Sequence, residues 1–261
     1  DNVAVSCSKA TLYMIVLPNL ELKIRVYLEG SLLHNGNETA EGRPLMRDNL
    51  RHSPFTGERY IPNNDPYQFE NTFFDIRNKY HHAGCGGYTK FQTIEKPDSV
   101  FGINGQNAIV DWVFVELRSK LDNKIVIATR SGLLQRDGDI VDIDGTGPLQ
   151  FPGIAIDQYF VSIRHRNHLG IMSLNALPVF ELQSLVDFTS MSFPTFDFGT
   201  TKNNGYDYTG LAQNSYVYSG FNAMWAGDFD ANSKIKASNP NDDINNLFFE
   251  IFVFPENTLG N

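Results

Sequence analysis

The chain lacks the short motifs that identify the common enzyme classes. Its 261 residues contain no GxSxG, no HExxH, no phosphate-binding loop and no dinucleotide fingerprint. No apolar run approaches the roughly 20 residues that a membrane-spanning helix needs. Basic residues are outnumbered, since 21 Lys and Arg face 30 Asp and Glu, which gives a net charge of −9. We therefore expect a protein that is not an enzyme, that binds no nucleic acid and that does not insert into a membrane.

Cysteine is nearly absent as well, with only Cys7 and Cys85. In an acidic, loop-rich and exported chain, such a pair allows one disulfide. The alternative is two unpaired thiols, and the sequence leaves both open. The chain starts at Asp1 without methionine, and no basic segment precedes the first apolar run, so it reads as a processed form or a fragment.

What the chain does have is apolar, aromatic-rich strands separated by turn-forming residues. The run AIVDWVFVELRS (108–119) is apolar at alternate positions on both sides, which is typical of a central strand covered on both faces. KIVIATR (124–130) and YFVSIRH (159–165) repeat this composition. ELKIRVYLEG (21–30) alternates as a half-buried strand does. The pattern predicts an all-β fold, an antiparallel β-sandwich of immunoglobulin-like or jelly-roll-like type, with long ordered loops over 31–106 and 188–224.

No linker or repeat divides the chain, so we expect one β-sandwich domain over residues 1–261. Residues 1–20 would form its N-terminal strand segment, and residues 225–245 a calcium-type loop.

The calcium prediction rests on GDFDANSKIKASNPNDD (227–243). Asp228, Asp230 and Asn232 occupy alternate positions, as the first oxygen ligands of an EF-hand-type loop do. The backbone carbonyl of Lys234 would follow, and Ile235 would pack into the core. Position twelve is Asn239 and position six is Ser233, so a bidentate carboxylate and a glycine are missing. Asp242 or Asp243 could fold back to supply the charge, with an affinity of about 0.1–1 mM. The alternative is an ordinary Asx-rich turn.

Three further polar groups have structural explanations that we favour. The aspartates of RDGDIVDIDGTG (136–147) fit two turns around a short IVDI strand better than a second cation site. In RHRNH (164–168) the histidine spacing suits no metal pair on a strand, and we expect Glu116, Arg118, Arg130 and Arg164 to pair across strands. His81, His82 and Cys85 lack a fourth ligand for zinc.

Several segments resemble a module of very large exported proteins from gliding, type IX-secreting Bacteroidetes. The segments that carry the resemblance are MRDNLR (46–51), YIPNNDPY (60–67), NAIVDWVFVELRS (107–119), VIATRSGLLQRDGDIVDIDG (126–145), YFVSIRHRNHLGIMS (159–173) and MWAGDFDANSKI (224–235). The resemblance implies a cell-surface or extracellular location and a degenerate dockerin-like calcium loop after WAGD. Asp98-Ser99-Val100 is similar to the O-glycosylation acceptor of these bacteria, with Ser99 as the target.

Together these features predict a non-catalytic structural or adhesive module of an extracellular bacterial assembly, such as a fibre, a filament or a large adhesin. Its partners would be other subunits or domains of that assembly, joined by strand addition. The alternative is a carbohydrate-binding accessory domain of a secreted polysaccharide-degrading enzyme, in which Trp225 would stack on a sugar of a surface glycan.

Overall fold

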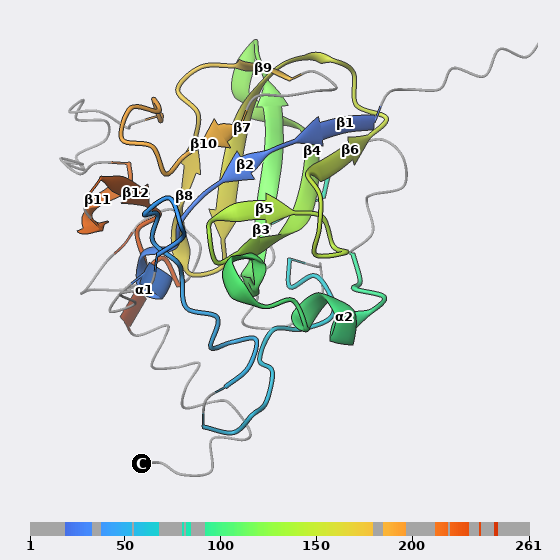
Figure 1. Ribbon diagram of the computed structural model, residues 1–261. Helices are drawn as coiled ribbons and strands as arrows, with labels where there is room; N and C mark the ends of the chain where they lie inside the picture. Colours follow the sequence, from blue (N-terminus) through green and yellow to red (C-terminus); the bar gives the residue numbers. More distant parts are fainter. Residues whose placement is uncertain are drawn as a thin grey trace, which may run out of the picture.

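The protein is built almost entirely from strands, as Figure 1 shows in a computed structural model. The structure describes residues 19–32, 38–53, 55–67, 80, 82–84, 92–179, 185–196, 212–218, 220–229, 235 and 243–244. Strands make up 44% of these residues and helices 9%, so the predicted all-β, sandwich-like fold class is confirmed. The single-domain interpretation of residues 1–261 stays a prediction.

The elements follow one another in three groups. The chain begins with β1 (Asn19–Leu22), β2 (Ile24–Arg25), α1 (Glu29–Leu32), α2 (Pro97–Phe101) and the 3-10 helix η2 (Gly105–Asn107). The central group is β3 (Ile109–Ser119), β4 (Asp122–Gln135), β5 (Asp139–Val141), β6 (Leu149–Pro152), β7 (Asp157–His165) and β8 (His168–Met172). The last group is β9 (Leu177–Val179), β10 (Val186–Asp187), β11 (Asn214–Tyr218) and β12 (Phe221–Ala223).

The main sheet has eight strands and is centred on the long hairpin of β3 and β4 (Figure 1). Its order is β10-β2-β5-β4-β3-β7-β8, and β9 pairs with one end of β7. All pairs are antiparallel except β10 with β2. Two small sheets, β1 with β6 and β11 with β12, accompany it.

Strand β3 is apolar on both faces, as the sequence predicted for its central strand. Val113, Val115 and Leu117 belong to one buried cluster. Trp112 and Phe114 belong to a second cluster on the other face. Ile109 joins that second cluster although simple alternation assigns it to the side of Val113, because the register with β4 shifts between Ile109 and Asp111.

The two faces of the sheet are covered by different kinds of structure. One cluster packs against side chains of β1 and β6, including Leu22 and Phe151. The other packs against the irregular region between α1 and β3, from which Tyr67 and Tyr80 enter the core. The Tyr67 hydroxyl donates to the Trp112 carbonyl over 3.0 Å. This region therefore supplies the second covering layer, although its described residues form none of the named strands.

The first half of β4 departs from the expectation that KIVIATR lies in the core. Ile125 is 52% exposed and Ile127 39% exposed, and burial begins only at Ala128. The physical reason is the short reach of β5, which pairs with β4 only at Leu133 and Leu134. In the part of the chain that the structure describes, only β3 forms a ladder with the first half of β4.

Candidate functional site

Two segments that the sequence singled out lie against each other in the structure. One is the RHRNH turn between β7 and β8, and the other is Trp225–Asp228, called here the WAGD segment. The Leu169 N–H donates to the Trp225 carbonyl over 2.8 Å. The Gly227 N–H donates to the Asn167 carbonyl over 3.0 Å. The hairpin turn therefore carries the segment from which the candidate calcium loop starts.

A carboxylate of α1 holds the WAGD segment from the other side. The Ala226 N–H donates to Glu29 Oε2 over 2.7 Å. The other oxygen, Oε1, accepts from Asn214 Nδ2 at the start of β11, also over 2.7 Å. Charge-assisted bonds of this kind are among the stronger ones in proteins. Glu29 thus connects α1, β11 and the WAGD segment.

Beneath this junction lies a buried ion network centred on Asp111 of β3. Asp111 Oδ2 accepts from Arg166 Nη2 over 2.7 Å and lies 3.2 Å from His165 Nε2. Asp111 Oδ1 accepts the Trp112 N–H over 2.8 Å. Burial raises the pKa of Asp111, but Arg166 and then His165 outweigh it and leave the pKa below its usual value. The carboxylate is therefore held charged inside the sheet.

His168 adds a second imidazole to this network. Its Nδ1 lies 3.1 Å from His165 Nδ1 and 2.7 Å from Asn167 Oδ1. Burial, and then the charge of His165, lower the pKa of His168 well below 6.5, so its ring is neutral at pH 7. Within the described residues no group bonds to its Nε2. The contact of His165 ties the turn to β3, and the contacts of His168 hold the turn itself, so both support the structural interpretation of RHRNH.

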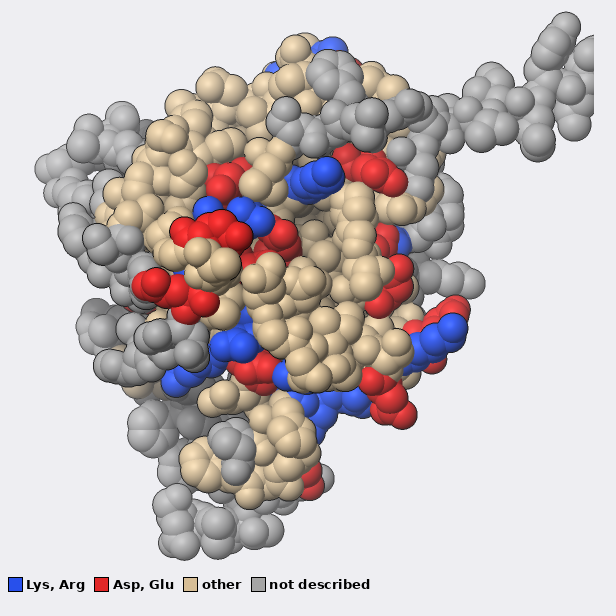
Figure 2. Space-filling model, in the orientation of Figure 1, with Lys and Arg blue, Asp and Glu red and all other residues tan. Residues whose placement is uncertain are grey.

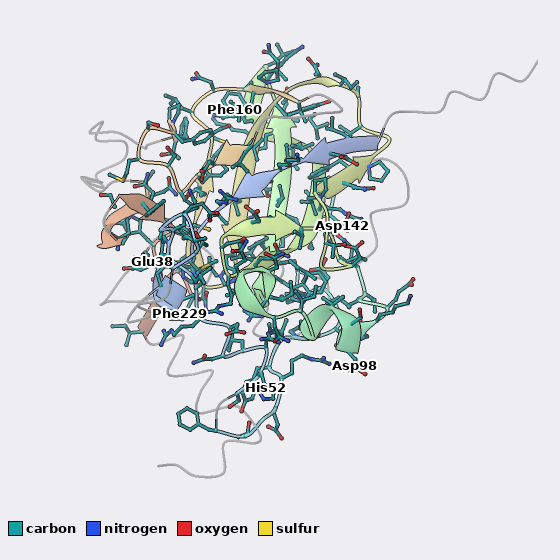
Figure 3. The ribbon with its side chains drawn as sticks, in the orientation of Figure 1. Glu38, His52, Asp98, Asp142, Phe160 and Phe229 are labelled. Atoms are coloured by element: carbon teal, nitrogen blue, oxygen red, sulfur yellow. The ribbon has the colours of Figure 1, made fainter. Side chains whose placement is uncertain are left out.

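The two ends of the candidate calcium loop come together above this junction. Asp228 and Asp243 are 3% and 2% exposed. The Phe229 N–H donates to Asp243 Oδ1 over 2.9 Å, so Asp243, one of the two aspartates named as able to fold back, lies beside the start of the loop. Figure 3 shows Phe229 at the edge of the molecule that carries α1. The carboxylates of Asp228 and Asp243, buried at the two ends of the loop, are oxygen ligands of the kind that calcium prefers.

The other predicted ligands, Asp230, Asn232, Lys234, Asn239 and Asp242, lie outside the described residues. Within those that are described, no group of three or more His, Cys, Asp or Glu side chains forms a metal cluster. Calcium binding therefore stays a prediction.

One detail of the loop prediction is wrong. Ile235 was expected to pack into the core, but it is 47% exposed. Its side chain lies over Gly227, where an added Cβ would come within 3.2 Å of Ile235 Cγ2. Gly227 also has φ +118°, which side-chain-bearing residues rarely adopt. The glycine lets the chain turn tightly enough for Ile235 to cover it.

The aspartates of the 136–147 segment take structural roles, as the favoured interpretation predicted. β5 is the short strand, and turns flank it on both sides. Asp139 pairs with Arg25 across strands, and Asp142 accepts from Arg130 Nη2 over 2.9 Å. Figure 2 shows acidic and basic side chains interspersed on the face that Figure 1 presents.

The expected pairing of charges across strands is confirmed for Glu116 and Arg164. Arg118 also pairs with Glu116, but both residues lie on β3. Glu116, 3% exposed, accepts from Arg118 Nε over 2.8 Å. Its other oxygen lies 3.5 Å from Arg164 Nη1 on the neighbouring β7. Arg130 pairs with Asp142 instead, because Glu116 and Arg130 lie at neighbouring positions of the β3–β4 register and so face opposite sides of the sheet.

Of the remaining predicted residues, Ser99 lies apart from this junction, Trp225 belongs to it, and the others lie elsewhere or outside the described residues. Ser99 is exposed on the short helix α2, and Figure 3 places its neighbour Asp98 far from Phe229. Trp225 is half-buried, and its carbonyl is used by the β7–β8 hairpin. Cys7 and Cys85 lie outside the described residues, as does His81. His82, from the rejected zinc group, contacts Asp65 and Thr129 instead.

Sequence reasoning missed Glu29 and the cluster around Asp65. Glu29 meets Ala226 across 197 positions, and Asp65 meets Ser131 across 66. No local spacing signals such contacts. The one available hint is the Asn-Asp-Pro turn sequence before Tyr67, which places Asp65 where its side chain caps the Tyr67 N–H.

Comparison with protein-family models, with curated proteins and with solved structures gave no match. Over the described residues, no helix is long and apolar enough to cross a membrane.

Proposed function

We propose that this chain is a non-catalytic structural or adhesive module of an extracellular or cell-surface bacterial assembly. The observation that carries the proposal is the exposed apolar half of β4. Leu121, at the hairpin tip, is 89% exposed, and Ile125 and Ile127 follow on one face of the strand. Among the described residues only β3 pairs with this half of β4, and a strand edge with such side chains favours pairing with another chain. The partner would be another subunit or domain of the same assembly.

The interior supports this proposal because ion pairs to buried carboxylates connect its strands. The ion pairs of Asp111 with His165 and Arg166, and of Glu116 with Arg164, connect β3 to β7 and to the turn that follows it. Such networks restrict the strands to one arrangement, which suits a module that transmits force between neighbours. In the same proposal, the loop between Asp228 and Asp243 binds calcium weakly and stiffens the edge of the sheet where α1 lies. The resemblance to exported Bacteroidetes modules and the acidic charge of −9 support the extracellular location.

Assembly is tested by light scattering after size-exclusion chromatography and by negative-stain microscopy, over a range of protein concentrations. We expect oligomers or filaments that an Ile125→Thr/Ile127→Thr variant loses. Phe55→Ser is the matched control, because Phe55 is 94% exposed in a different region. A particle that stays monomeric at every concentration, with and without millimolar calcium, contradicts the proposal.

Calcium binding is tested separately by titration calorimetry on chelator-treated protein. We expect binding with a dissociation constant of about 0.1–1 mM. The Asp228→Asn variant should lose this heat, whereas Asp122→Asn, an exposed aspartate outside the loop, should keep it. No heat from the wild-type protein at millimolar calcium refutes the calcium site.

The rival proposal, carbohydrate binding, is favoured by one observation. A groove of about 490 Å³ opens between β2, β5 and the β5–β6 loop. Apolar Ile140 and Leu185 line it beside the polar groups of Asn107, Gln135 and Thr146, a mixture typical of small-ligand sites. A glycan array distinguishes the possibilities: binding lost with Asn107→Ala assigns it to the groove, and binding lost with Trp225→Ala assigns it to the tryptophan.

A further inference from the structure

A second buried polar cluster joins β4 to the irregular layer that covers it. Asp65, His82 and Gln92 come from that layer, and Thr129 and Ser131 come from β4. Ser131 is fully buried, Asp65 is 2% exposed and Gln92 is 7% exposed. Burying so many polar groups is costly unless each of them finds a partner.

The Ser131 hydroxyl lies directly against a carboxylate. Ser131 Oγ donates to Asp65 Oδ2 over 2.7 Å. The same oxygen lies 2.8 Å from His82 Nε2, and the other carboxylate oxygen accepts the Tyr67 N–H over 2.8 Å. The far side of the imidazole is held by Thr129 Oγ1, 3.1 Å from His82 Nδ1. Asp65 is thus fixed in position to take a proton from Ser131, as a general base does.

An amide lies on the other side of the same serine. The Ser131 N–H donates to Gln92 Oε1 over 2.9 Å. The amide carbon is bonded to that oxygen at about 1.2 Å. The side-chain carbonyl group of Gln92 therefore lies next to Ser131. The backbone of Gln92 is fixed to the same group, because its carbonyl accepts the Asp65 N–H over 2.9 Å.

The amide nitrogen is the one unsatisfied part of the cluster. Gln92 Nε2 is buried, and no acceptor among the described residues bonds to it. A buried unpaired donor costs free energy, and such exceptions in a folded protein need an explanation. The oxygen of this amide is polarised by an N–H, whereas none of the described residues holds its nitrogen.

We propose that Ser131 and Gln92 join in an intramolecular ester bond. Ser131 Oγ attacks the side-chain carbonyl carbon of Gln92 while Asp65 accepts the hydroxyl proton. The Ser131 N–H stabilises the negative charge that develops on Oε1. The C–N bond then breaks, the proton passes from Asp65 to the departing nitrogen, and ammonia leaves. Serine and glutamine become ester and ammonia with no oxidant or other reactant.

The bond would fasten the irregular layer covalently to the longest strand of the sheet. A protein that is exposed outside the cell and bears load gains from a link that survives local unfolding. The full burial of Ser131 keeps water from the ester and so protects it from hydrolysis. His82 and Thr129 act here as positioning residues, because they contact Asp65 or its partner rather than the reacting carbon. The proposal is independent of calcium binding and of assembly.

The test is the intact mass of the full chain after complete denaturation and reduction. We expect a mass below that of the sequence by one ammonia, together with a cross-linked peptide that joins the regions of Gln92 and Ser131. Peptide sequencing is needed because Asn-Gly pairs such as Asn104-Gly105 can also lose ammonia. The unshifted mass refutes the proposal, as does a loss that maps elsewhere.

Variants confirm the assignment of each group. Ser131→Ala should restore the full mass expected for its own sequence, and Asp65→Asn should leave most of the chain unlinked. Ser162→Ala is the matched control, because Ser162 is also a buried strand serine, 5% exposed, and should keep the ammonia loss. A link that persists in Ser131→Ala, or that maps to Thr129, overturns the assignment. The mass is measured on denatured chains, so a folding defect in a variant leaves the wild-type result decisive.

Discussion

Replacing Arg166 by leucine should destabilise the protein strongly, because it leaves the buried Asp111 carboxylate without its cationic partner. The Asp111 side chain is only 3% exposed, whereas Arg166 is 27% exposed. Without Arg166, the carboxylate keeps the Trp112 N–H and His165 as partners. Removing one partner of a buried pair costs about 3–5 kcal/mol, and the two remaining donors place the loss near the lower end.

The reverse change should cost less. Asp111→Asn leaves Arg166 without its partner, but that side chain can reach water with its charged end. We expect a loss of about 1–2 kcal/mol. The double variant should lose less than the sum of the two single changes, because neither group is then left alone.

Urea unfolding at pH 7 measures the free energy of unfolding of all three variants. An unchanged dependence of that free energy on urea concentration checks that each variant unfolds in two states. The pH dependence adds a second check. The folded pKa of Asp111 is lowered, so its contribution is present above the unfolded value of about 3.9 and is lost as the pH falls through the folded pKa. The deficit of Arg166→Leu should therefore shrink in acid. An Asp111→Asn variant that is less stable than Arg166→Leu would refute the reasoning.

The remaining predictions concern the WAGD junction. Because the pKa of His168 is lowered, its contribution to the free energy of unfolding is full above about pH 6.5 and is lost as the pH falls below that value, by up to ~1.4 kcal/mol per pH unit. Urea unfolding from pH 7 to pH 5 should show a weaker pH dependence for His168→Gln. Gly227→Ala should cost about 1–3 kcal/mol, from its positive φ and the contact with Ile235; Gly57→Ala, with positive φ but open space around it, should cost less, and equal losses would contradict the role of Ile235. Glu29→Gln should speed amide hydrogen exchange at Ala226, and unchanged exchange there would show that the Glu29 contact does not hold the segment.

The pattern of side chains along β3 was sufficient to predict a central strand with two covered faces. Trp112 and Phe114 alternate with Val113 and Val115, and both sets are buried. The same reasoning failed for Ile125 and Ile127 because composition reports whether a residue can be buried, not whether a neighbour reaches far enough to cover it. It also misplaced Ile109, since a register shift is a property of the pairing of two strands and not of either one alone.

The candidate site was predictable only in pieces. WAGD and RHRNH were each recognised in the sequence, and Asp242 or Asp243 was named as able to fold back. Their contact was not foreseen, because hydrogen bonds such as Leu169 to Trp225 depend on how the chain returns to β8. For the same reason, the Asn-Asp-Pro turn before Tyr67 is the one local signal of the Asp65 cluster.

Strand content, charge balance and the turns around β5 follow from local preferences, which each short stretch of residues expresses through its own periodicity and turn chemistry. The contacts of Asp111, Glu29 and Ser131 with distant residues depend instead on the tertiary structure. Arg166, Ala226 and Gln92 lie tens of positions or more from these residues along the chain, and only tertiary packing brings their atoms within bonding distance.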